Sequence, residues 1–137
     1  MSDEETLPWP QGIGFEFLLS VAEVVEGDPQ CDDLGAVIAA AARASAMRMG
    51  RPIYATPFLR AAAAAITLIR ERPLEAGNLA YGLVAATGYL RANGIHLVWS
   101  PDEGWDLAKG IETYTLGVTE AAAVLKSWED RPRGEDA

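Results

Sequence analysis

Apolar residues recur every three or four positions along most of the chain, which is the spacing of amphipathic helices. In the stretch 78–93, for example, Leu79, Leu83, Ala86 and Leu90 fall on one helical face. Alanine, the best helix former, is concentrated at 36–46, 61–65 and 121–123. The alternating β-branched runs that are typical of sheet proteins are nearly absent. The pattern therefore predicts an all-α fold.

Breakers and caps divide the pattern into about six helices. We expect them over residues 13–26, 32–49, 57–71, 78–93, 101–113 and 119–128, with 50–55 as a partly extended connector. The clearest starts are Thr56-Pro57 and Ser100-Pro101, where a hydroxyl N-cap precedes a proline at the first helical position. Glu103 completes a capping box at the second of these starts.

The helical periodicity also predicts which side chains are buried. In the first helix the predicted buried set is Phe17, Val21, Val24 and Val25. Arg60 and Arg70 are predicted outside the most buried stripe of the third helix. Gly82 and Gly88 interrupt the fourth helix, where glycine costs about 1 kcal/mol relative to alanine. Close backbone packing would account for them, so the helix over about 78–93 is predicted to be central.

A length of 137 residues suits one domain, predicted over 13–128, with an arm at 1–12 and an acidic tail at 129–137. The longest apolar run, 61–69, is under half of the roughly 20 residues that span a bilayer. The first residues are acidic, whereas a secretory signal begins with positive charge. These features predict a cytoplasmic protein.

The charge balance is strongly acidic, with 11 Lys plus Arg against 20 Asp plus Glu and a net charge of −9. Such a surface repels nucleic-acid phosphates and anionic lipids, so we expect neither nucleic acid nor a membrane as a partner. The single cysteine, Cys31, excludes an internal disulfide framework, and the single histidine, His96, is predicted to face solvent. We predict no metal site.

The loop between the third and fourth helices carries the candidate chemistry. It reads Arg72-Pro73-Leu74-Glu75-Ala76-Gly77-Asn78-Leu79-Ala80. Free N–H groups at a helix N-terminus, with a glycine that permits close approach, form an anion-binding arrangement. The predicted ligand or anion-binding residues are Arg72, Gly77, Asn78 and Tyr81. Each also has a purely structural interpretation: Arg72 paired with Glu71 or Glu75, Asn78 as a helix cap, and Tyr81 in the core.

This loop and its flanks resemble the Fic/Doc family, in particular its small death-on-curing (Doc) branch. Residues 72–80 align with the family signature His-Pro-Phe-x-x-Gly-Asn-x-Arg, and Tyr89-Leu90-Arg91-Ala92-Asn93-Gly94 resembles the Leu-Arg-Arg-Asn-Gly helix end of that branch. Ser100-Pro101 follows at the same distance. The resemblance covers roughly residues 15–128 and implies a compact Fic/Doc-like helical domain.

The same resemblance implies that the family's transfer chemistry is lost. In the family the motif histidine is the general base, the motif acid holds Mg²⁺ on the nucleotide phosphates, and the motif arginine grips phosphate. Arg72, Ala76 and Ala80 stand at these three positions. An arginine stays protonated and cannot act as a base, and alanine has no ligand atom. The resemblance thus implies a pseudoenzyme without a cofactor, which binds a protein partner, antitoxin-like or phage-related, or an anion such as phosphate or a nucleotide.

A residual nucleotide-dependent transferase is the alternative. It would move AMP or phosphate from ATP with Mg²⁺ to a protein hydroxyl. Glu75, one residue before the motif acid position, would then supply the acid, and a group other than Arg72 would be the base. The three replaced residues weigh against this alternative, and the sequence leaves the partner, the substrate and the oligomeric state open.

Overall fold

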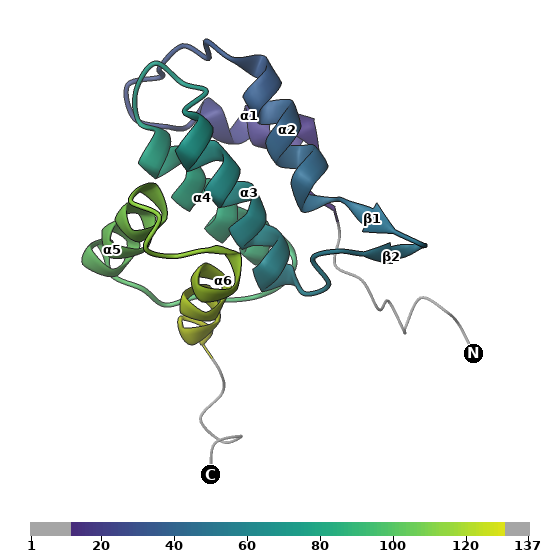
Figure 1. Cartoon of the computed structure of the whole chain (residues 1–137). Coiled ribbons are helices and arrows are strands. Elements are labelled where there is room, and N and C mark those ends of the chain that lie inside the picture. Colours follow the sequence, from purple (N-terminus) through teal and green to yellow (C-terminus); the bar gives the residue numbers. More distant parts are fainter. Residues whose placement is uncertain (1–11, 131–137) are drawn as a thin grey trace.

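The computed structural model describes residues 12–130, which contain six helices and one short β-hairpin (Figure 1). The helices are α1 (Phe15–Ala22), α2 (Leu34–Ala44), α3 (Pro57–Glu71), α4 (Asn78–Ala92), α5 (Pro101–Glu112) and α6 (Val118–Ser127). The hairpin pairs β1 (Met47–Arg48) with β2 (Arg51–Pro52) in antiparallel fashion. The prediction of an all-α fold is confirmed. Most of the predicted arm and tail lies outside the described residues.

The helix α3 is the most deeply buried element. Eleven of its fifteen residues are buried, including the whole run Ala61–Ala65. It packs against α2, α4, α5 and α6, and Figure 1 shows it crossing the middle of the molecule. The helix that was expected to be central corresponds to α4, which packs along α3 and also contacts α1 and α5. The centre of the fold is thus the α3–α4 pair, with α3 in the more enclosed position.

The two helices approach each other closely at Gly82. A Cβ atom at this position would lie 2.5 Å from Cγ1 of Ile69 and 3.1 Å from the carbonyl oxygen of Ala65. At Gly88 the nearest atom to a Cβ would be Cζ of Phe17 at 3.8 Å, an ordinary van der Waals distance. The close packing that both glycines predicted is therefore present at Gly82 only.

The predicted helix starts with proline are confirmed, together with their caps. Oγ1 of Thr56 accepts a hydrogen bond from the N–H of Leu59 at 3.1 Å. At the start of α5, the Ser100 N–H donates to Oε1 of Glu103 at 2.8 Å, and the Glu103 N–H donates to the Ser100 hydroxyl at 3.2 Å. These caps satisfy N–H groups that have no acceptor within the helix.

The predicted end of the first helix is wrong. α1 ends at Ala22, and the chain then turns through Gly27 and Asp28, whose φ angles are +88° and +46°. Because the helical register is lost before residue 24, Val24 is 71% exposed instead of buried, whereas Val25 is buried.

The second helix also ends earlier than predicted, at Ala44 instead of near Met49. The Ser45 hydroxyl donates to the carbonyl oxygen of Ile13 at 3.3 Å, a contact between distant segments. Met49 and Gly50 form the turn of the hairpin, both with positive φ. Two such residues are typical of the tight turn that matches the twist of two antiparallel strands.

The two arginines that were predicted outside the buried stripe of α3 differ from each other. Arg60 is only 5% exposed, so the prediction is wrong for this residue; within residues 12–130 its Nε has no hydrogen-bond partner and no carboxylate forms an ion pair with it. Arg70 donates to the carbonyl oxygens of Ile111 (3.0 Å) and Leu116 (2.9 Å), and its guanidinium lies 4.0 Å from the ring centroid of Tyr114. Arg70 therefore joins α3 to the end of α5.

Within residues 12–130, no helix combines the length and the apolar character that crossing a bilayer requires.

Replacing the two α4 glycines by alanine should have opposite effects. We expect Gly82→Ala to lower the free energy of unfolding by about 1–3 kcal/mol, because the new methyl group overlaps Ile69. Gly88→Ala should raise it by about 0.5–1 kcal/mol through helix propensity alone. Urea unfolding of both variants measures the two values, and a similar change in both would contradict the close approach at Gly82.

Replacing Arg60 and Arg70 of α3 by methionine should have different effects on the free energy of unfolding. We expect Arg60→Met to leave the free energy of unfolding unchanged or to raise it by up to about 2 kcal/mol, since it removes a buried guanidinium whose Nε has no hydrogen-bond partner among residues 12–130. Arg70→Met should lower it by about 1–3 kcal/mol, since two carbonyl groups lose their donor. Thermal and urea melts test the contrast; a larger loss in Arg60→Met would show that Arg60 has acceptors.

Candidate functional site

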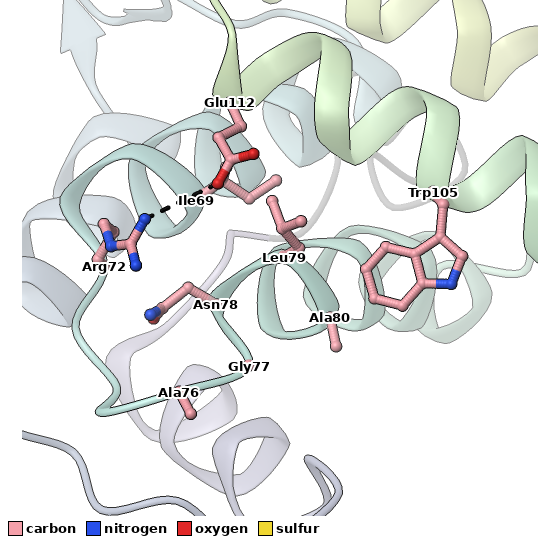
Figure 2. Close-up of a pocket in the computed structure, with 9 residues that line it drawn as sticks. All are labelled: Ile69, Arg72, Ala76, Gly77, Asn78, Leu79, Ala80, Trp105 and Glu112. Atoms are coloured by element: carbon pink, nitrogen blue, oxygen red, sulfur yellow. Dashed lines mark ion pairs between the residues drawn. The ribbon is translucent and has the colours of Figure 1, made fainter.

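A surface pocket of about 260 Å³ lies at the N-terminal end of α4 (Figure 2). The end of α3, the following loop, the first turn of α4 and one side of α5 form its walls. Its lining residues are Ile69, Arg72, Ala76, Gly77, Asn78, Leu79, Ala80, Trp105 and Glu112. The loop that the sequence singled out thus borders a cavity, and α5 supplies a wall that the loop sequence alone does not indicate.

Two left-handed residues shape the loop. Arg72 ends α3 with φ 54° and ψ 61°, and Gly77 precedes α4 with φ 78° and ψ 23°. Between them, the carbonyl oxygen of Pro73 accepts from the N–H groups of Asp32 (2.8 Å) and Asp33 (3.1 Å). The loop is therefore held on its outer side by the segment that leads into α2.

The side chain of Asn78 holds the loop closed. Its Oδ1 accepts from the Leu74 N–H and its Nδ2 donates to the Leu74 carbonyl oxygen, both at 2.9 Å. Asn78 is only 8% exposed, and the N-cap of α4 is Gly77. The amide group of Asn78 is thus used within the loop and does not cap the helix.

The first turn of α4 presents backbone donors to the pocket. The Tyr81 N–H donates to the Gly77 carbonyl oxygen at 2.9 Å and is the first N–H of the helix with an acceptor one turn back. The N–H groups of Asn78, Leu79 and Ala80 precede it and have no acceptor within the helix. All three residues line the pocket. Since a helix N-terminus also carries about half a positive charge, this end of the pocket favours an anion.

Arg72 and Glu112 face each other at one end of the pocket (Figure 2). Nη1 of Arg72 lies 3.8 Å from Oε2 of Glu112, and the two side chains are 67% and 37% exposed. An ion pair this exposed contributes about 0–1 kcal/mol, so an incoming anion can compete for the guanidinium. Glu112, and neither Glu71 nor Glu75, is the carboxylate that Arg72 pairs with in the structure. The sequence gives no local signal for Glu112, because only the packing of α5 against α3 and α4 brings it here.

Glu75 and Tyr81 do not line the pocket. Oε1 of Glu75 accepts from the Gln30 N–H at 2.8 Å, and the Glu75 N–H donates to the Gln30 carbonyl oxygen at 2.9 Å. Tyr81 is fully buried and its hydroxyl donates to the Leu18 carbonyl oxygen at 2.7 Å. Burial raises the pKa of the Tyr81 phenol, which therefore stays a protonated donor. The structure favours the core interpretation of Tyr81, and it directs Glu75 away from the position of a displaced acid.

Two aromatic residues near the start of α5 have different environments. Trp99 stacks on Trp128, with ring centroids 5.3 Å apart and an interplanar angle of 17°. Trp105 is 46% exposed and borders the pocket at the end away from Arg72 (Figure 2). His96 is exposed, as predicted. Over residues 12–130, no three metal-ligating side chains of His, Cys, Asp or Glu gather in one place.

Neither a protein-family model nor a curated protein matches this chain. The resemblance to the Fic/Doc family therefore stays a prediction, and the function has to be argued from the geometry of the pocket.

Removing the Asn78 amide should destabilise the protein, because this side chain holds the loop between α3 and α4. We expect Asn78→Ala to lower the free energy of unfolding by about 2–3 kcal/mol, because both backbone groups of Leu74 lose their partner in a buried place. Ser20→Ala removes one exposed hydrogen bond to the Phe17 carbonyl oxygen and should cost less than about 0.5 kcal/mol. Urea unfolding compares the two; equal small losses would mean that Asn78 does not hold the loop.

Proposed function

We propose that this protein is a catalytically degenerate Fic/Doc-like protein that works by binding, and that its pocket at the start of α4 holds a small anion such as phosphate or a phosphomonoester. The observation that carries the proposal is that Arg72 and residues 78–80, whose N–H groups have no acceptor within α4, line one cavity. Free backbone donors at a helix N-terminus and an arginine that can bind two oxygens at once are the groups that proteins use for phosphate.

The size of the pocket supports a small ligand. Its volume of about 260 Å³ lies just under the range of roughly 300–1,000 Å³ that is usual for drug-sized ligands. A phosphate group fits beside Arg72 and the α4 N-terminus. The half-exposed ring of Trp105 then offers an apolar face to the substituent of a phosphomonoester.

The charged groups of the pocket favour binding over transfer. A general base has to lie within hydrogen-bond reach of the proton that it removes, with a pKa near the working pH. Arg72 stays protonated, and Glu112 pairs with it at 3.8 Å. Glu75, the acid that a residual transferase needs, bonds the Gln30 backbone instead. Transfer of AMP or phosphate thus has no free acid or base among the groups named for it.

The proposal predicts that phosphate stabilises the protein through Arg72. At ten times its Kd, a ligand of the folded state adds about 1.4 kcal/mol to the free energy of unfolding. We expect phosphate to raise the Tm of the unmodified chain and of Arg91→Gln, an exposed arginine at the far end of α4, but not that of Arg72→Gln. Sodium chloride at equal ionic strength is the control for screening.

A variant of Glu112 should have the opposite effect on phosphate binding. Glu112→Gln frees Arg72 and removes a negative charge from the pocket, so phosphate should bind about two- to fivefold more tightly, as expected for loss of an exposed ion pair. The same melts with AMP, ADP and ATP, each with and without Mg²⁺, test the alternative. A large Mg²⁺-dependent shift with ATP would favour the residual transferase, and no shift with any of these ligands would overturn the anion proposal.

A further inference from the structure

Acidic and basic residues are segregated along the chain. No Asp or Glu occurs from Leu34 to Arg70, a stretch that contains five arginines. This stretch therefore carries a charge of +5, while the rest of the chain carries −14. It comprises α2, the β-hairpin and nearly all of α3, and since most of α3 is buried, its solvent-facing part is α2 and the hairpin.

The outward face of α2 is apolar. The inward face consists of Ala36, Val37, Ala40 and Ala44, which are buried. On the opposite face, Leu34 and Ile38 lie one turn apart and are 51% and 53% exposed, followed by the exposed Ala42. A surface helix is normally polar on its solvent side. A helix that is apolar on both sides indicates that a partner covers the second side.

The β-hairpin, which follows α2 directly, also carries exposed apolar and basic side chains. Met47, Met49 and Ile53 are 56%, 91% and 54% exposed. Arg48 and Arg51 are directly opposite each other in the register of the two strands and are also exposed. Figure 1 shows the hairpin projecting from the helices just beyond the end of α2. We call this region the α2–hairpin surface, formed by Leu34, Ile38, Met47, Arg48, Met49, Arg51 and Ile53.

The cations of this surface differ in their availability. Arg43, in the last turn of α2, donates through Nε to the Tyr54 hydroxyl at 3.0 Å and through Nη1 to the Thr67 hydroxyl at 3.5 Å, so it is already engaged. Arg48 and Arg51 form no ion pair with any residue of the described part of the chain. The surface therefore presents two unpaired guanidinium groups next to exposed methionines, which adapt readily to the shape of a partner.

The charge pattern selects the kind of partner. A two-fold dimer through this surface would bring together two identical patches that carry arginines and, over residues 34–70, no carboxylate to pair with them, which is electrostatically unfavourable. An acidic amphipathic helix provides an apolar stripe for Leu34 and Ile38 and carboxylates for the two arginines. The charge of −14 on the rest of the chain is largely screened at distances beyond about 8 Å at physiological salt. The charge of the partner that is attracted here is therefore set by the local arginines. We infer that the α2–hairpin surface docks an acidic amphipathic segment of a partner protein.

This inference is independent of the anion pocket. The hairpin precedes the first residue of α3, whereas Arg72 follows its last, and fifteen helical residues span about 22 Å. Variants of Arg48 and Arg51 should leave phosphate binding unchanged, and Arg72→Gln should leave partner docking unchanged. Failure of one proposal can therefore be distinguished from failure of the other.

Fluorescence anisotropy with designed peptides tests the inference on the full chain. The probe is a labelled helical peptide with a leucine stripe and glutamate at its polar positions, measured in 0.15 M salt. We expect micromolar binding that Arg48→Glu/Arg51→Glu and, separately, Ile38→Asp each weaken at least tenfold. The matched controls Arg91→Glu and Val24→Asp change exposed residues elsewhere and should bind as the unmodified chain does. Because all the substituted residues are exposed, circular dichroism should show the same helix content in every variant.

Several outcomes would overturn the inference. One is no binding of the glutamate peptide up to millimolar concentration, and another is binding that ignores the hairpin and Ile38 variants. A lysine version of the peptide should bind Arg48→Glu/Arg51→Glu more tightly than it binds the unmodified chain. If it binds this variant more weakly, charge complementarity is not the cause of peptide binding. If a peptide of residues 1–11 displaces the glutamate peptide, the α2–hairpin surface binds a segment of this chain and not a partner protein. A dimer in sedimentation that Ile38→Asp dissociates would assign it to a second copy.

Discussion

The close contact between α3 and α4 is the constraint on which the rest of the structure depends. It requires small residues on both helices, and the chain supplies the run Ala61–Ala65 on one and Gly82 on the other. Since alanine and glycine bring little apolar area to a core, most of the stabilisation comes from the larger side chains that close around this contact, such as Leu68 and Leu90. The loop that joins the two helices must then span a short, fixed gap. The pocket lies where this loop and the adjoining ends of α3 and α4 meet α5.

The residues that keep the loop in shape are separate from those that give it chemistry. Gly77 supplies a left-handed turn, and Asn78 holds both backbone groups of Leu74. Neither contributes a side chain to a ligand, yet together they leave the donors at the start of α4 uncovered. The shape of the loop therefore does not depend on the side chain at a position such as Ala76, because shape and chemistry rest on different side chains.

How much the sequence could predict depended on how local the cause was. Helix starts followed from side chains within three residues of the cap, as at Ser100 and Glu103, and they were predicted correctly. At the end of α2, which was predicted too late, the C-cap Ser45 contacts Ile13, a residue distant in sequence that no local pattern indicates. The site shows the same division: the loop was found from its own residues, whereas Glu112 reaches it only through tertiary packing. The burial of Arg60 likewise overrides an ordinary preference of charged side chains for solvent.

The placement of positive charge connects the two proposed binding regions. In a chain of net charge −9, a cation surrounded by acids would be neutralised and would offer little to an anionic ligand. Arg48 and Arg51 lie in the stretch 34–70, which contains no acid, and among residues 12–130 they form no ion pair. The carboxylate that pairs with Arg72 in this part of the chain, that of Glu112, is partly exposed and 3.8 Å away. Arg48 and Arg51 precede α3 in the chain and Arg72 follows it, so these three cations lie on either side of the buried helix. An acidic surface elsewhere discourages nonspecific association with other anions, so these two places are where selective binding of negative groups is physically most favourable.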